Sequence, residues 1–177
     1  MNAFNIEDRR SVYATPWFDL VAKQLSDDPA PHYSIATPDY VSVLAVTPQG
    51  SFALVRQFRP AIEQMTLELP SGHVDEGETP EDAARRELRE ETGLLADEFI
   101  LLGELAPDTG RLGNRMWCFF AAGVVRDPAS GFLPEPGVEP IMYTKGLRDL
   151  VLHEQEFCSA LNRAAVLLAV AKGLLQL

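Results

Sequence analysis

Three glutamates spaced for one face of a helix stand out between residues 72 and 94. Glu87 and Glu91 are four residues apart, so on a helix they lie one above the other, and Glu90 adjoins Glu91. Carboxylates this close repel one another, and a bound divalent cation removes that penalty. Ligation by oxygen alone favours Mg²⁺ or Mn²⁺ over zinc. The spacing therefore predicts a magnesium site on a helix, with Mn²⁺ able to substitute.

Local signals predict that helix independently. Thr79 is a suitable N-cap and Pro80 suits the first helical position. Glu81 and Asp82 place negative charge in the first turn, where the helix dipole favours it. Gly93 is a natural stop, because glycine adopts the left-handed conformation at low cost. The alternative for such a charged run is a solvated surface helix with many ion pairs, which needs no function.

The fixed positions of the whole segment favour a functional interpretation. Gly72 is followed after five residues by Glu78, and after seven more by the run Arg86-Glu87-Leu88-Arg89-Glu90-Glu91-Thr92-Gly93-Leu94. This spacing resembles the Nudix box of the Nudix hydrolases, which cleave nucleoside diphosphates linked to another moiety. The resemblance implies a metal held by the Ser71 carbonyl, Glu87, Glu90 and Glu91. It implies a structural role for Gly72, Glu78, Arg86 and Gly93.

Two further segments resemble the ADP-ribose pyrophosphatase group of that family. Residues 55–60 read VRQFRP and residues 67–75 read LELPSGHVD, and Pro107 fits the proline that this group carries beyond the box. The loop after Pro107 departs from the group, which commonly has an acidic residue there, so the sugar specificity stays open. The resemblance implies hydrolysis of ADP-ribose to AMP and ribose 5-phosphate, with Mg²⁺ bridging the phosphates and acidifying a water.

Four residues are candidates for substrate binding. A planar guanidinium suits bidentate contacts to phosphate or ribose, so Arg56, Arg59 and Arg111 are expected to contact substrate. A surface salt bridge is the alternative for Arg56 and Arg59, because exposed arginines are common. Arg111 lies with Asn114 and Arg115 on a glycine-rich loop, where recognition of phosphate or of the terminal ribose is expected. Glu68, on a short expected strand, is predicted either to contact a substrate hydroxyl or to stabilise Arg59.

The general base is left between two loop carboxylates. Besides Glu87 and Glu91, which act through the metal, related enzymes draw a base from a mobile loop after the box, and here that loop spans residues 127–140. Glu135 lies deep in the loop, and Glu139 stands at the start of the next strand. Both stay candidates for the catalytic base.

Other functions remain open at this point. Within the family, the substrate could be GDP-mannose, another nucleotide sugar or a nucleoside triphosphate. A different class of protein would be a non-catalytic module that senses ADP-ribose or a nucleotide. Such modules often lose box acids, and all of them are present here, which favours an enzyme.

Composition bounds the partners and the compartment. The chain has 177 residues and a net charge of −11, which argues against binding a nucleic-acid backbone and suits a small nucleoside diphosphate only if metal ions reverse the local sign. No apolar run is long enough to cross a bilayer, and residues 1–10 are too polar for a secretory signal. Cys118 and Cys158 are expected to be reduced, buried thiols of a cytoplasmic protein.

The order of elements predicts an α+β fold. Strands are expected at 39–46 and 52–58, paired as a hairpin, and a long helix at 155–172. The result is a mixed sheet between helices, which agrees with the Nudix α/β/α sandwich that the resemblance implies. Residues 1–36 are expected to form a small β appendage, separate from a hydrolase domain at 37–177. In related enzymes such an arm contributes to a homodimer.

Overall fold

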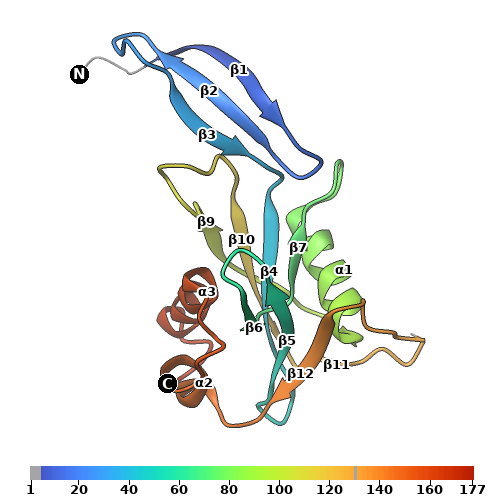
Figure 1. Cartoon of the computed structure of the whole chain (residues 1–177). Coiled ribbons are helices and arrows are strands. Elements are labelled where there is room, and N and C mark those ends of the chain that lie inside the picture. Colours follow the sequence, from blue (N-terminus) through green and yellow to red (C-terminus); the bar gives the residue numbers. More distant parts are fainter. Residues whose placement is uncertain (1–4, 130) are drawn as a thin grey trace.

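A mixed sheet lies between helices in the computed structural model, which describes residues 5–129 and 131–177 (Figure 1). Helix α1 (Pro80–Thr92) covers one face, and helices α2 (Leu147–Leu152) and α3 (Ala160–Ala171) cover the other. This arrangement confirms the predicted α+β sandwich. The strand order is β12 (Val138–Tyr143), β5 (Phe52–Arg59), β4 (Tyr40–Val46), β10 (Met116–Ala122) and β9 (Ile100–Leu105), with β6 (Gln64–Glu68) on β5 and β7 (Ser71–His73) on β4.

The central strand β4 joins two hydrophobic cores. Its side chains alternate between the sheet faces, as the pleat requires. Val41 and Val43 pack in one core with Leu88 of α1, whereas Leu44 packs in the other core with Val166 of α3. Strand β10 runs parallel to β4 along its whole length. Because β4 is buried on both faces, it reads as a nearly continuous apolar run.

The strands β4 and β5 form the antiparallel hairpin expected from the sequence, but they pair only at their adjoining ends. Ala45 and Val46 face Ala53 and Phe52, after which the strands separate. Strand β7 then pairs with the first half of β4, and β6 pairs with the second half of β5. Because the strands separate, polar residues of β4, β5, β6 and β7 surround one cavity.

Helix α1 has the boundaries that its capping signals predicted. The Thr79 hydroxyl accepts a hydrogen bond from the Asp82 N–H at 3.2 Å. Gly93 is left-handed, with φ at 69°, and its N–H donates to the Arg89 carbonyl at 2.8 Å. Helix α1 therefore begins and ends on local signals alone.

The C-terminal helix is shorter than predicted. Helix α3 begins at Ala160 rather than near residue 155, because Ser159 acts as its N-cap and its hydroxyl accepts from the Asn162 N–H. The residues before it form neither helix nor strand, and the Glu156 carbonyl accepts a hydrogen bond from the Leu67 N–H of β6 at 2.9 Å. Pairing with a strand from another part of the chain thus overrides the apolar periodicity.

The N-terminal strands form a second, antiparallel sheet that stands at one end of the molecule (Figure 1). It consists of β1 (Ile6–Ala14), β2 (Asp19–Leu25) and β3 (His32–Ala36). The link to the rest is an isolated bridge, in which Ile35 exchanges backbone hydrogen bonds with Arg111 and Gly113. Trp17 is 72% exposed and Tyr13 65%, so aromatic surface is open on this sheet.

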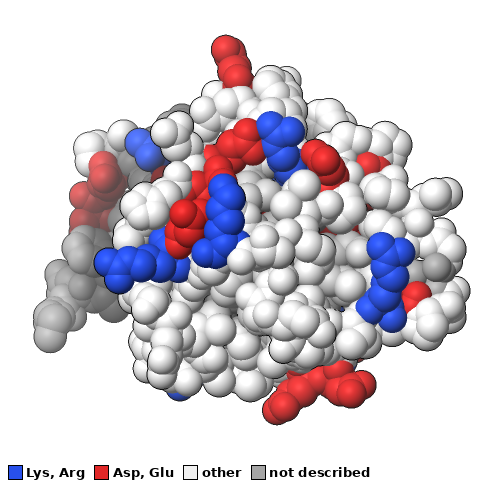
Figure 2. Space-filling model, turned by 90° about the horizontal axis from the view of Figure 1, so that it is seen from below, with Lys and Arg blue, Asp and Glu red and all other residues white. Residues whose placement is uncertain are grey.

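A short two-stranded sheet and the surface complete the fold. Strand β8 (Leu94–Leu95), which follows α1, pairs with β11 (Val125–Arg126). Figure 2 shows acidic and basic side chains touching in a band on one face, with most of that face uncharged. Within the described ranges, no helix has both the length and the hydrophobicity to cross a membrane. Both cysteines are free, but Cys158 is exposed, contrary to expectation, because it lies in the irregular segment before α3.

Candidate active site

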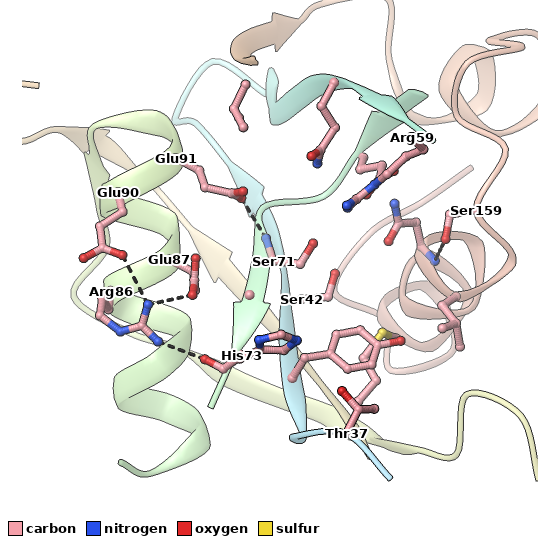
Figure 3. Close-up of a pocket in the computed structure, with 18 of the residues that line it drawn as sticks. Thr37, Ser42, Arg59, Ser71, His73, Arg86, Glu87, Glu90, Glu91 and Ser159 are labelled. Carbon is pink, nitrogen blue, oxygen red and sulfur yellow. Dashed lines mark hydrogen bonds and ion pairs between the residues drawn. The ribbon is translucent and has the colours of Figure 1, made fainter. Parts of the chain in front are cut away.

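A cleft of about 830 Å³ opens where β4 and β5 separate. One wall is α1, from which Glu87, Glu90 and Glu91 project (Figure 3). Strand β7 lies beside these acids, Ser42 of β4 lies next to Ser71 of β7, and Ser159 before α3 lies across the cavity. The cleft therefore collects residues from both halves of the sandwich.

Glu91 is the most deeply placed acid, with 8% of its surface exposed. One carboxylate oxygen accepts a hydrogen bond from the Ser71 N–H at 2.8 Å. Burial raises the pKa of Glu91 to about 8; the Ser71 bond opposes this shift, while Glu87 and Glu135 add repulsion. Burial also raises the pKa of Glu87. In Glu87 and Glu91, the surrounding protein therefore does not fully offset the cost of burying a charged carboxylate.

Arg86 organises the acids around it. Its Nη1 donates to Glu87 at 2.6 Å and to Glu90 at 3.2 Å, and its Nη2 donates to the His73 carbonyl at 2.9 Å. The same guanidinium binds Glu78 through two contacts, at 3.0 and 2.9 Å, and these lower the pKa of Glu78. Arg86 therefore ties the loop before α1 to the helix and to β7.

Steric constraints explain why glycine occupies positions 72 and 93. A Cβ on Gly72 would lie 1.9 Å from a carboxylate oxygen of Glu87, so only glycine lets that side chain rest against β7. At Gly93 the left-handed backbone already favours glycine, and a Cβ would lie 2.7 Å from the Phe132 ring. The second contact fixes the loop that follows β11 over the end of α1.

That loop brings Glu135, but not Glu139, to the cleft. Glu135 lines the cavity and contributes to the raised pKa values of Glu87 and Glu91. Glu139 is on β12, its side chain is 61% exposed, and it lies 3.8 Å from Arg56 instead. The geometry favours Glu135 as the loop carboxylate that reaches the acids.

The four substrate-binding candidates separate into two pairs. Arg59 and Glu68 line the cleft and bind each other through two hydrogen bonds, at 2.8 and 2.5 Å. Burial would raise the pKa of Glu68, but hydrogen bonds from Arg59 and from the Thr66 hydroxyl lower it. Arg59 and Glu68 therefore stay candidates for contact with substrate.

Arg56 and Arg111 do not line the cleft. Arg56 holds Glu156 through two hydrogen bonds, at 2.7 and 2.8 Å. Arg111 is paired with Asp108 at 3.2 Å in the loop that meets the N-terminal sheet, and its side chain is 80% exposed. Within one chain, both arginines are therefore engaged in ion pairs away from the cleft. For Arg56, this is the alternative that the sequence left open.

The donor set suits a hard divalent cation. Three carboxylates from one helix face the same cavity, and two of them have pKa values raised mainly by burial, a penalty that a nearby cation removes. In this arrangement Arg86 occupies oxygens of Glu87 and Glu90, and no group of three His, Cys, Asp or Glu residues in the described part of the chain converges as a ready ligand set. Binding a cation would therefore require the acids to exchange Arg86 contacts for metal contacts.

Comparison with known proteins places this architecture. Residues 36–140, more than half of the chain, match the family model described as the NUDIX domain. The chain belongs to the Nudix family. A crystal structure titled as that of an ADP compounds hydrolase superimposes with a TM-score of 0.79 at 21% identity, covering 98% of this chain and 97% of that one, which supports the Nudix fold.

Two curated relatives match parts of the chain. An ADP-ribose pyrophosphatase of Bacillus subtilis is 49% identical over 59 residues, which is 33% of this chain and 32% of the relative. An ADP-sugar pyrophosphatase of Mus musculus is 58% identical over 83 residues, which is 47% of this chain and 38% of the relative. The chain thus spans about a third of the length of these relatives.

Sequence reasoning missed two polar residues of the cleft, Ser42 and Asn162, and expected the third, Asn114, only as part of a recognition loop. Ser42, Asn114 and Asn162 are nearly fully buried and line the cavity. Ser42 interrupts the apolar run of β4, and Asn162 interrupts the apolar face of α3. A polar residue within a buried apolar run was the signal that could have identified both.

Replacing Gly72 with alanine tests the close approach of β7 to Glu87 of helix α1. Because the new Cβ would overlap the end of a flexible side chain, Glu87 should move while the fold survives. We expect Gly72→Ala to lower metal-dependent activity by at least about tenfold, with a thermal midpoint close to that of the parent. The matched control is Gly131→Ala, whose Cβ would meet nothing within 4 Å. Equal activity of the two variants would contradict this account.

The raised pKa of Glu91 predicts how the metal-free protein responds to pH. The group titrates near 4.5 when unfolded and near 8 when folded, so the native state binds more protons between these values and stability falls as pH rises through that window. Without divalent cations, the thermal midpoint of the parent should decrease from pH 5.5 to pH 8. In Glu91→Gln this decrease should be smaller, and at pH 8 the variant should melt above the parent. A larger decrease in the variant would refute the assignment.

Proposed function

We propose that this chain is a Nudix hydrolase that cleaves the diphosphate of a nucleoside diphosphate sugar, with ADP-ribose as the first substrate, giving AMP and ribose 5-phosphate. The observation that carries the proposal is the acidic wall of α1, formed by Glu87, Glu90 and the buried Glu91, in a cleft that also holds a loop carboxylate. The names of the two curated relatives support the nucleotide-sugar class of substrate.

The metal would be Mg²⁺, or Mn²⁺ in its place, held by Glu87, Glu90, Glu91 and the Ser71 carbonyl. When bound, such a cation neutralises charge on the diphosphate and acidifies a water. The contact between the Ser71 N–H and Glu91 supports this set, because it keeps the backbone at Ser71 beside the deepest acid. Arg86 is a positioning residue, which keeps two of the acids on one side of the cleft.

The chain's own groups supply proton transfer and orientation. Glu135 is the proposed general base, because it lines the cleft and faces the acids, and it would accept the proton of the attacking water. Arg59, held in place by Glu68, would orient the substrate at the opposite end of the acidic wall. Phe132, packed on Gly93, would fix the loop that carries Glu135.

A substrate panel with product identification tests the proposal. With Mg²⁺, ADP-ribose should yield AMP and ribose 5-phosphate faster than GDP-mannose or a nucleoside triphosphate yields its products. Glu87→Gln and Glu91→Gln should each lower kcat by about a hundredfold or more, because each removes a metal ligand. The control is Glu81→Gln, on the same helix but paired with Arg85 outside the cleft. Binding of ADP-ribose without turnover of any substrate would instead identify a sensing module.

We also propose that the N-terminal sheet mediates a homodimer. Its exposed aromatic surface, with Trp17 and Tyr13, supports an apolar contact with a second copy. Arg111, beside this sheet, would then be near the interface. Light scattering should give the mass of a dimer, and Trp17→Ser should shift it toward the monomer. Leu133→Ser is the control, since Leu133 is 85% exposed but lies in the loop near α1; a monomeric parent would exclude the dimer.

A further inference from the structure

The wall of the cleft that faces the Nudix helix carries buried polar atoms without partners. Among the described residues, four buried side-chain atoms lack a hydrogen bond: Ser34 Oγ, Ser42 Oγ, Asn114 Oδ1 and Asn162 Nδ2. Three of their residues line this one cleft, and Ser34 is the exception. We call Ser42, Asn114 and Asn162 the neutral wall. Because a buried polar group without a partner costs about 1–3 kcal/mol, such a concentration at one cavity calls for a ligand.

Distant parts of the fold build the neutral wall. Ser42 is on β4, held between its neighbours Cys118 of β10 and Ser71 of β7. Asn114 precedes β10, and Asn162 lies in the first turn of α3. Their residues are 1%, 5% and 5% exposed, respectively. Each side chain therefore sits on a rigid element, or directly beside one, which is what a specific binding site requires.

The chemistry of the neutral wall is that of a hydroxyl partner. Asn114 Nδ2 donates to the Pro38 carbonyl at 3.0 Å, which leaves Oδ1 as a fixed acceptor. Asn162 offers a donor, and the Ser42 hydroxyl can donate or accept. A phosphate oxygen only accepts and would be repelled by Asn114 Oδ1. A sugar hydroxyl both donates and accepts, so it can satisfy the whole set.

The charges in the cleft also indicate that phosphate and sugar would bind on different sides. The two arginines among the described lining residues, Arg59 and Arg86, are both paired with carboxylates. The side of the cleft away from α1 thus offers no unpaired guanidinium to a phosphate. The diphosphate would lie with the cations on the acidic wall, which places the uncharged parts of the substrate opposite.

We propose that the neutral wall binds ribosyl hydroxyls of the substrate and so sets specificity for a sugar on the diphosphate. This inference rests on the proposed hydrolase function, whose substrate it defines further. It assigns Ser42, Asn114 and Asn162 to substrate recognition, a role separate from metal binding and from proton transfer.

Four related diphosphates test the inference. They are ADP-ribose, its analogue with a 2′,3′-dideoxy nucleoside, the pentyl ester of ADP, and the pentyl ester of the dideoxy nucleotide. All four share adenine and the diphosphate. The dideoxy compounds lack the hydroxyls of the nucleoside ribose, and the pentyl esters lack the second sugar with its ring and hydroxyls. The variants are Ser42→Ala, Asn114→Leu and Asn162→Leu, compared by kcat/KM with Mg²⁺.

Each variant should lower kcat/KM about tenfold for compounds that carry the recognised hydroxyls, which is the size of one lost hydrogen bond. The dideoxy pentyl ester should react equally with parent and variants. The pattern across the panel identifies whether the nucleoside ribose or the second sugar is bound. An equal loss on all four compounds would mean contact with adenine or the diphosphate, and no loss on any would mean that water fills the site; either result overturns the inference.

Ser34→Ala is the matched control. It removes another buried hydroxyl without a partner, but from the pocket between the N-terminal sheet and the loop at residue 110. It should leave all four rates unchanged. Ser42→Ala also guards against misfolding, since replacing an unpartnered hydroxyl with an apolar group should not lower the thermal midpoint.

Calorimetric binding separates failure of this inference from failure of the hydrolase proposal. If the parent cleaves none of the four compounds, the hydrolase proposal fails, and binding alone decides the role of the neutral wall. Binding of ADP-ribose that weakens about tenfold in Ser42→Ala, with the dideoxy pentyl ester unaffected, would support it. Binding that is undetectable, or that Ser42→Ala leaves unchanged, would overturn it.

Discussion

The burial of two carboxylates on one helix face is the constraint on which the rest of the site depends. Glu87 and Glu91 both have raised pKa values, chiefly because the protein has removed them from water. Packing does not require these acids, because Leu88 and the small residues Ala83 and Ala84 already fill the contact between α1 and the sheet. The fold thus gives up stability at these positions, which is the pattern expected of a site built for a cation.

Several local features of the structure keep the buried acids in position. Gly72 has no side chain, so β7 can lie against Glu87. Arg86 spreads its donors over four acceptors and keeps the repelling acids together. Gly93 both ends α1 and receives the Phe132 ring, which brings the loop of Glu135 near the same acids. Each device has a different physical role, yet all of them act on the position of the Nudix helix face.

The sequence could predict the parts of the site that depend on local rules. The capping residues of α1 and the i,i+4 spacing of its acids need no knowledge of distant contacts. Arg56 and Arg59 show where this fails, because both are strand arginines near the box. Residues alternate between the faces of a strand, so these two, three positions apart, cannot share a face. Arg56 meets Glu156, one hundred positions away, a contact that only the folded chain creates.

The same limit explains the late start of α3 and why the sequence predicted neither Ser42 nor Asn162 of the neutral wall, although it placed Asn114 on a recognition loop. The apolar periodicity before Ala160 is helical, but the Glu156 carbonyl is taken by β6. Ser42, Asn114 and Asn162 share no motif and come together only because β4 and β5 separate while β10 runs parallel to β4. Their common property is an unpartnered buried atom, which is a property of the packed structure and of no segment by itself.

The distribution of charge links binding of an anionic substrate to binding of the cation. The chain carries a net charge of −11, and the arginines lining the cleft are committed to carboxylates. An anion approaching the metal-free acids would be repelled, because the acidic wall and the overall charge have the same sign. In the proposed function, cations on the acidic wall would attract the diphosphate, and the opposite wall would need only neutral groups. The proposed cleft would then be divided by charge: one side would bind phosphates through cations, and the other could distinguish the groups attached to them.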